Sequence, residues 1–193
     1  MAVEVSLLDM LDARERRVHH QQELLERYHK PLICFTMNIA GPIKGLAAQD
    51  FAGVTAENAA TAGQKLYAQY GITGIRGQVE AGLPVVLHHG LPVLETGLKL
   101  GYDINRSGCA ALLEILVHST DTNMIARSSR ERQLAWVTRV NELLAQTPYP
   151  DEEALVELDD QFIAENLSPG GSADLLALTY LLHFFKTEEH LHV

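Results

Sequence analysis

The chain has 193 residues, of which 47% are hydrophobic, so it is expected to form one domain, or one domain with a small appendage, around a substantial core. Its formal net charge of −10 excludes a large nucleic-acid-binding surface, because such a surface needs a basic face. An anionic ligand would have to be held locally, by a few arginines, by backbone N–H groups or by a metal ion.

Cysteine usage and apolar runs indicate the compartment. The two cysteines, Cys34 and Cys109, are not part of any C-x-x-C pair, so the sequence carries no cysteine-based zinc motif. The first residues lack the apolar stretch of a signal peptide, and the longest apolar run, at residues 175–182, is too short to cross a bilayer. We therefore expect a cytoplasmic protein without a membrane segment.

The N-terminal residues differ in character from the rest of the chain. Residues 6–29 predict an amphipathic helix, because their leucines and valines keep roughly to one face, and Pro31 would end it. The run at residues 32–39 is the best strand candidate in the sequence. Residues 1–45 are therefore predicted to form a short helix-plus-strand appendage.

From residue 46 to 193, helix-forming residues dominate, which predicts an all-α, multi-helix domain of the orthogonal or bundle-like type. The expected helices are residues 47–69, 86–100, 107–127, 130–146, 152–165 and 172–187. Gly101 suits the C-terminal cap of the second helix and Ser107 the N-terminal cap of the third. Trp136 is expected in the core.

The first of three segments that interrupt the helical pattern is YGITGIRGQVEAGLP, residues 70–84. Its four closely spaced glycines allow the backbone to approach a ligand or to adopt positive φ. Arg76 can bind a phosphate through two parallel hydrogen bonds. The alternative is a long turn with a surface arginine, which the spacing alone favours, because the pattern matches neither a P-loop nor a dinucleotide-binding fingerprint.

The second segment is a polar cluster, residues 119–127, inside an otherwise apolar helix. Asp121 and Asn123 offer the hard oxygen ligands that suit Mg²⁺. Arg127 follows Asn123 by one helical turn and would face the same way. A helix end with capping polar groups explains the same residues, and the sequence leaves both interpretations open.

The third segment is NLSPGGSADLLA, residues 166–177, a glycine-rich turn that leads into an apolar helix. The free N–H groups at such a helix start form an anion site, and Ser168 and Ser172 add hydroxyl groups. Asp174 in the first turn can stabilise the helix dipole, ligate a metal or act as a base. An ordinary serine-capped helix is the alternative.

The histidines are less informative. His88 and His89 fit packing or surface positions, and His190 and His192 lie near the end of the sequence. Because neither cysteine partners nor an HExxH spacing accompanies them, the sequence does not predict a histidine metal site.

Taken together, the three segments resemble the triphosphoribosyl-dephospho-CoA synthase family, whose members carry YGxxGxRGExxxGFP-like, DTNxxxRGG-like and NLSPGGSADLLA-like stretches in this order. The corresponding stretches here are YGITGIRGQVEAGLP, DTNMIARSS and NLSPGGSADLLA, within residues 46–186. Gln78 stands where the family has glutamate, and Ser128 and Ser129 stand where it has two glycines. The TPKPGLVD-like and GVNTHKG-like stretches of the family's N-terminal half are missing.

This resemblance implies an all-α transferase that joins ATP to dephospho-CoA and releases adenine, for the citrate lyase prosthetic group. Such a site must neutralise a triphosphate, stabilise an oxocarbenium-like transition state and manage a proton on each side of the displacement. The implied substrate-binding residues are Gly74, Arg76, Gly77, Asn123, Arg127, Ser168, Gly170, Gly171 and Ser172. The implied catalytic residues are Glu80 and Asp174, and the implied Mg²⁺ ligands are Asp121 and Asp174.

Residues 7–44 resemble instead the start of the citrate lyase holo-acyl-carrier-protein synthases, through LLDMLDARERR and PLICFTMNIAGPIK. Two other functions therefore remain open: a catalytically incomplete nucleotide- or partner-binding protein, and a holo-acyl-carrier-protein synthase-like transferase. Because half of a helical domain would leave apolar helix faces in water, we expect a homodimer or a complex with another citrate lyase assembly protein.

Overall fold

The structure is a computed structural model that describes residues 51–189. Helices and their connecting loops make up this range, and no β-strand occurs within it, so the all-α class expected from the sequence is confirmed. The helix expected at residues 6–29 and the strand expected at 32–39 lie outside the described residues. None of the helices between residues 51 and 189 is both long and apolar enough to cross a membrane.

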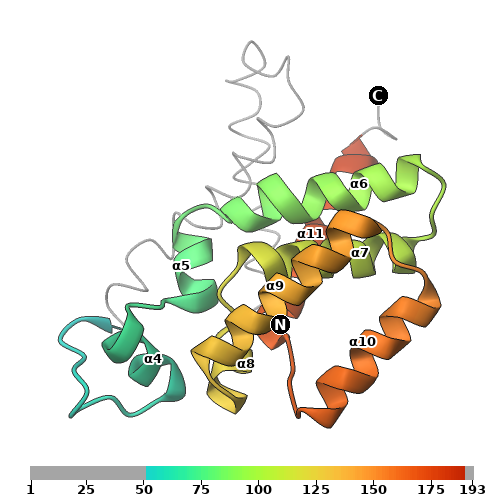
Figure 1. The fold of residues 1–193 in the computed structure, drawn as a ribbon. Coiled ribbons are helices and arrows are strands. Elements are labelled where there is room, and N and C mark those ends of the chain that lie inside the picture. The colour runs from blue at the N-terminus through green and yellow to red at the C-terminus, as the bar shows by residue number, and fades with distance from the viewer. Residues whose placement is uncertain (1–50, 190–193) are drawn as a thin grey trace, which may run out of the picture.

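The described helices pack around one central helix, α7 (Figure 1). In chain order they are α4 (Ala62–Tyr70), α5 (Gly74–Glu80), the π-helical turn η2 (Val86–Gly90), α6 (Leu91–Lys99), α7 (Ile104–His118), α8 (Thr122–Arg127), α9 (Arg130–Gln146), α10 (Glu152–Ala164) and α11 (Gly170–Glu189). Helix α7 contacts η2, α6, α9 and α11, whereas α4, α5 and α8 lie together at one end of the molecule (Figure 1).

The first described helix is much shorter than expected. The sequence predicted residues 47–69, but α4 begins only at Ala62, and residues 52–61 are turns and an extended link. A capping box sets this start: the Thr61 hydroxyl accepts the backbone N–H of Gln64 at 3.1 Å, and the Gln64 side chain accepts the backbone N–H of Thr61 at 3.2 Å. The predicted start at residue 47 was wrong, because Thr61 and Gln64 accept backbone N–H groups at a helix start that lies at Ala62.

The helix expected at residues 107–127 is two helices. The chain leaves helical geometry at Ser119 and starts again after Asp121, which caps α8. Ser107 was wrongly expected as an N-terminal cap, since it is fully buried inside α7. The cap is Asp103, whose carboxylate accepts the N–H of Arg106 at 2.8 Å.

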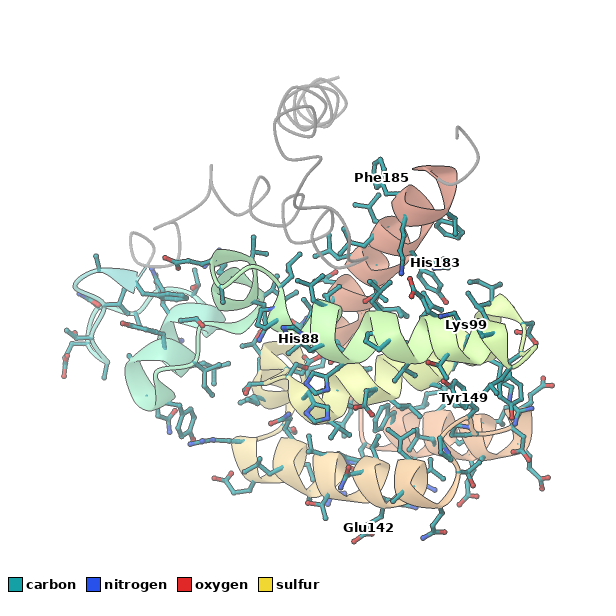
Figure 2. All side chains as sticks on the ribbon, turned by 90° about the horizontal axis from the view of Figure 1, so that it is seen from above. His88, Lys99, Glu142, Tyr149, His183 and Phe185 are labelled. Atoms are coloured by element: carbon teal, nitrogen blue, oxygen red, sulfur yellow. The ribbon has the colours of Figure 1, made fainter. Side chains whose placement is uncertain are left out.

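Gly97 on α6 accounts for the burial of Ser107. Because Gly97 has no side chain, α6 approaches α7 closely and covers Ser107. A Cβ atom at Gly97 would lie 2.6 Å from the Ser107 hydroxyl and 2.7 Å from the ring of Tyr149. Tyr149, in the link between α9 and α10, donates its hydroxyl to the carbonyl of Val93 on α6 at 2.9 Å (Figure 2). Gly101 follows α6 with a φ of 89°, as its predicted capping role requires.

The core consists of two hydrophobic clusters that α7 joins. The first gathers residues from the η2 region, α7 and α11: Leu83, Val85, Val86, Leu91, Ile115, Leu175 and Leu182. The second gathers residues from α7 to the start of the third polar segment: Leu113, Leu116, Met124, Trp136, Val140, Leu144, Leu158, Phe162 and Leu167. Trp136 is 3% exposed, which confirms its predicted core position.

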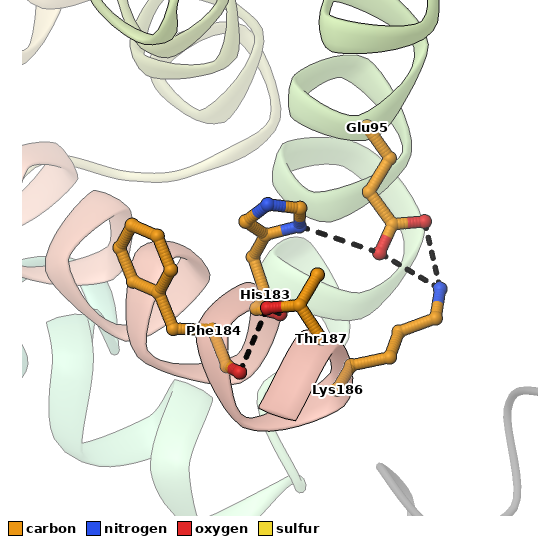
Figure 3. Close-up of polar contacts among 5 residues, drawn as sticks. All are labelled: Glu95, His183, Phe184, Lys186 and Thr187. Carbon is orange, nitrogen blue, oxygen red and sulfur yellow. Dashed lines mark hydrogen bonds and ion pairs between the residues drawn. The ribbon is translucent and has the colours of Figure 1, made fainter. Parts of the chain in front are cut away.

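An ion pair fastens the C-terminal part of α11 to α6 (Figure 3). Lys186 donates to both oxygens of Glu95 at 2.7 and 2.8 Å, and the Nδ1 atom of His183 lies 3.8 Å from the same carboxylate. Because α11 packs on α5, η2, α7 and α8 as well, its N-terminal end is held at a defined place beside α8.

Candidate functional site

The three segments singled out in the sequence meet at one cavity of about 360 Å³. Its lining comes from residues 71–75, 77 and 78 of the first segment, from 118–120 and 122 around the second, and from 171 and 175 of the third. Part of the first segment is helical, as α5, where a long turn was the simpler interpretation. The cavity is therefore a candidate ligand site to which α5, α8 and α11 all contribute.

A buried carboxylate joins the second and third segments behind this cavity. Asp121 is 1% exposed, and one of its oxygens accepts the N–H groups of Asn123 and Met124 at 2.9 and 3.1 Å. The other oxygen accepts the N–H and the hydroxyl of Ser172 at 2.7 and 2.9 Å. Asp121 therefore caps α8 and α11 at once, and its negative charge faces the positive ends of both helices.

These contacts bear on the expected magnesium site. A carboxylate offers about four acceptor positions, and four donors already occupy those of Asp121. A magnesium ion could bind there only if capping hydrogen bonds were broken. Asp174, the second expected ligand, is exposed on the first turns of α11. The arrangement does not fit Mg²⁺, and the structure favours a structural role for Asp121.

Ser172 is likewise used inside the protein. It is fully buried and donates to Asp121, and its hydroxyl lies 3.3 Å from that of Ser119. The carbonyl of Ser119 in turn accepts the side-chain amide of Gln133 on α9 at 3.3 Å. These hydrogen bonds fix the wall of the cavity rather than offer a free hydroxyl to a ligand.

The glycines of the motifs allow the segments to touch one another. A Cβ atom at Gly170 would clash with the Asn123 side chain, and one at Gly171 would lie 3.3 Å from the Asp121 carboxylate. Gly74 has a φ of 59°, and a Cβ there would approach Thr122 to 3.0 Å. Gly74 is the position among these whose positive φ favours glycine, whereas a side chain at Gly170 or Gly171 would require a neighbouring side chain to shift.

The remaining expected residues lie outside the lining. Arg76 is exposed on α5, with its guanidinium 5.9 Å from the ring centre of Phe51, and Arg127 is exposed at the end of α8. Glu80 and Ser168 are partly buried. Of the expected site residues, Gly74, Gly77 and Gly171 line the cavity, Asp121, Gly170 and Ser172 pack behind it, and Asn123 is exposed beside Gly170.

Gln78, where the family resemblance has glutamate, also has a structural contact. Its side-chain oxygen accepts the N–H of Val85 at 3.3 Å, and its carbonyl accepts the N–H of Leu83 at 2.7 Å. Leu83 has a φ of 61°, so the chain turns sharply there before η2. Gln78 therefore connects the cavity wall to the turn that follows α5.

Sequence reasoning did not predict a cluster at the edge of the cavity, which His89, Glu114 and His118 form. The Nδ1 atom of His89 and the Nε2 atom of His118 lie 3.4 and 3.0 Å from the same oxygen of Glu114, and His118 lines the cavity. Glu114 and His118 are four residues apart, a spacing that places them on one helix face. Nothing local in the sequence brings His89 to them.

Comparisons with known proteins agree with the motifs. The CitG family model, described as ATP:dephospho-CoA triphosphoribosyl transferase, matches residues 14–192. A 2-(5''-triphosphoribosyl)-3'-dephosphocoenzyme-A synthase of Pectobacterium atrosepticum is 42% identical over 134 residues, which are 69% of this chain and 44% of that protein. A probable synthase of the same name from Citrobacter koseri is 43% identical over 137 residues, 68% of this chain and 45% of that protein. No solved structure matches.

The extent of these matches defines what they show. The chain spans less than half the length of the relatives, at 44% and 45%. The family match includes residues 14–45, most of the expected appendage, and the resemblance of residues 7–44 to holo-acyl-carrier-protein synthases stays a prediction outside the described residues. Matched over residues 14–192, the chain belongs to the ATP:dephospho-CoA triphosphoribosyl transferase family.

Proposed function

We propose that this chain acts in the transfer that its relatives are named for, joining ATP to dephospho-CoA with release of adenine for the citrate lyase prosthetic group. The observation that carries the proposal is the meeting of all three family-like segments at one cavity of about 360 Å³. Residues as far apart in sequence as Gly74 and Gly171 line it together. A volume of this order accommodates part of a nucleotide.

The start of α11 offers donors for a phosphate. The N–H of Ser172 is taken by Asp121 and that of Ala173 by the carbonyl of Pro169. The N–H groups of Gly170 and Gly171 have no acceptor within the described part of the chain, and Gly171 lines the cavity. These two amides, at the positive end of a long helix, are suited to bind an oxygen of the triphosphate.

In the proposed reaction the 2′-hydroxyl of the dephospho-CoA ribose attacks C1′ of the ATP ribose. The bond from C1′ to adenine breaks, the hydroxyl loses a proton and adenine gains one, so the triphosphate stays on the transferred ribose. Glu80 and Asp174 are the proposed proton-transfer groups. Arg76 and Arg127 are exposed, so in this proposal they contact phosphates that extend out of the cavity. No step is assigned to magnesium, because the Asp121 carboxylate is occupied.

The surface of α9 and α10 suggests an assembly. We propose a homodimer or a complex with another citrate lyase assembly protein, because large apolar side chains on these two helices are exposed. The alternative function, a nucleotide-binding protein without turnover, rests on the same cavity. Adenine release separates the two possibilities.

The test is a chromatographic assay of the purified chain with ATP, magnesium and dephospho-CoA. We expect adenine and a triphosphoribosyl adduct in equal amounts. ATP binding without adenine would support the nucleotide-binding alternative. A folded chain that neither binds ATP nor releases adenine would remove both.

A cavity-filling variant ties the activity to this site. Thr120 lines the cavity and is exposed in a loop, so Thr120→Trp should fill the space without disturbing a helix. We expect ATP binding to weaken by at least about tenfold, since a bound group would be displaced. Thr138→Trp, at an exposed position on α9, is the matched control and should bind ATP normally. Equal affinities in both variants would place the nucleotide elsewhere.

A further inference from the structure

We propose that His89, Glu114 and His118 form a binding site for a divalent transition metal ion, with Zn²⁺ as the ion that suits the ligands best. Two imidazoles and one carboxylate are a ligand set that such ions favour over Mg²⁺, which prefers oxygen ligands alone. The three side chains are the group between residues 51 and 189 whose potential ligand atoms all lie within 4.8 Å of one another. The site does not depend on the proposed transfer reaction.

The distances fit the edges of a coordination polyhedron. With metal–ligand bonds of about 2.1 Å, two ligand atoms lie about 3.0 Å apart at a right angle and about 3.4 Å apart at the tetrahedral angle. The Glu114 oxygen lies 3.0 Å from Nε2 of His118 and 3.4 Å from Nδ1 of His89. Two of the three edges therefore already have the required length. The ring nitrogens of the third edge lie within 4.8 Å of each other, and the stacked rings must turn toward a common point to close it.

Two packed elements, α7 and η2, place these side chains next to one another. Glu114 and His118 are one turn apart on the central helix α7. His89 comes from the π-helical turn η2, a local widening of the helix of a kind often found at functional sites. Gly90 lets η2 lie against α7, since a Cβ atom there would come within 2.8 Å of Ile115 and 2.7 Å of Thr179.

The charges and the exposure also suit an ion. Within the described residues, Glu114 forms no ion pair with Lys or Arg, so the two imidazoles are its partners. The side chains of His89, Glu114 and His118 are 33%, 26% and 40% exposed, which leaves a path for the ion. Three protein ligands leave positions open, and because His118 lines the cavity, a water or a phosphate oxygen held there can complete the coordination.

The competing explanation is a metal-free pair of stacked imidazoles. The rings of His89 and His118 lie 3.6 Å apart between centroids, inclined by 17°. Neutral histidines can stack in this way while one of them donates to Glu114. The two explanations differ in a measurable property, because only the first gives tight binding of one metal ion per chain.

The test uses the full chain, freed of metal with a chelator and titrated with Zn²⁺ by calorimetry and with Co²⁺ by visible absorption. We expect saturation near one equivalent and a Co²⁺ spectrum typical of imidazole coordination. His89→Gln, Glu114→Gln and His118→Gln should each lower the affinity by at least about tenfold, since loss of even a supporting contact typically costs about that much. A chain that takes up no ion at micromolar concentrations would overturn the proposal.

Two controls separate this site from adventitious binding. His88→Gln removes the neighbouring exposed histidine of η2 (Figure 2) and should leave the affinity unchanged. A double variant, His190→Gln with His192→Gln, removes two histidines outside the described residues and should also bind normally. If either control lost the ion while His118→Gln kept it, the site would be wrongly placed. The Co²⁺ spectrum of the wild-type chain remains decisive if a variant fails to fold, and failure of adenine release would not affect these measurements.

Discussion

Asp121 acts as a helix cap, which is one of the two roles that the sequence left open. The sequence presented it as a hard oxygen ligand or as a cap, and the structure makes it the cap of two helices at once. The alternative of a capping polar group was therefore the better interpretation. The sequence indicated one of its contacts, the start of α8, but not the second, because Ser172 lies 51 residues further along the chain.

Removing this carboxylate should destabilise the protein. Asp121→Ala leaves the N–H groups of two helix starts and the Ser172 hydroxyl without their acceptor. We expect the free energy of unfolding in urea to fall by roughly 2 to 4 kcal/mol, from two lost caps and buried unpaired donors. Asp159→Ala, at an exposed position on α10, should change it by less than about 0.5 kcal/mol. A similar small change in both variants would contradict the double-cap role.

The side chain of Glu165 connects α9 to the end of α10. It accepts hydrogen bonds from Nε of Arg132 at 2.6 Å and from the Trp136 indole at 2.8 Å, and it forms an ion pair with Arg132. The Arg132 and then the Trp136 hydrogen bonds hold the pKa of the Glu165 carboxyl below its usual value. The ionised form is thus favoured by folding.

This lowered pKa has a consequence for the pH dependence of stability. A carboxyl whose folded-state pKa is below its unfolded value stabilises the fold above the unfolded pKa of roughly 4.3, and this contribution is lost as the pH falls through the folded-state pKa. The stability difference between the wild-type chain and Glu165→Gln should therefore be present at pH 7 and shrink below about pH 4. Glu142→Gln, on the outer face of α9 (Figure 2), should show no such change. Urea unfolding at both pH values measures the difference.

At the scale of elements, the agreement between sequence and structure depends on how local the deciding interactions are. The helix at residues 130–146 has the expected bounds, because Ser129 caps it locally by accepting the N–H of Arg132. The π-helical turn η2 was not expected, since it arises where Gly90 packs against Ile115 and Thr179. Propensity alone would have continued one regular helix.

The contact at Gly90 gives a clear test of helix packing. Gly90→Ala should lower the free energy of unfolding by about 1 to 3 kcal/mol, because the added methyl group meets Ile115 and Thr179. Gly63→Ala, in α4, meets only the Thr61 hydroxyl at 4.0 Å and should leave stability unchanged or raise it by up to about 1 kcal/mol. Thermal and urea unfolding compare the two. Equal effects would mean that η2 is free to move away from α7.

At the scale of the whole molecule, the structure leaves large apolar side chains in water. Leu134, Val156 and Ile163 are 51%, 54% and 67% exposed on α9 and α10. Exposed apolar side chains of this size are candidates for contact with another protein surface. Association with a second copy is the simplest way to cover them.

Light scattering coupled to size exclusion tests this expectation directly. We expect a mass of about twice 21.3 kDa, because burying exposed apolar side chains favours association. Ile163→Glu should shift the protein toward the monomer, whereas Glu157→Gln, an exposed change on the same helix, should not. A wild-type chain that remains monomeric at high concentration would contradict the expected assembly.

The sequence by itself determined the helical class, the three polar and glycine-rich segments and the family, because each is a property of neighbouring residues. It also placed Trp136 in the core and a capping glycine, Gly101, after α6, since burial preference and positive φ are local signals. Only the tertiary structure decided that Asp121 joins α8 to α11 and that His89 meets Glu114, 25 residues away. Such contacts depend on how closely helices pack, and that is set by glycines and buried side chains on separate elements.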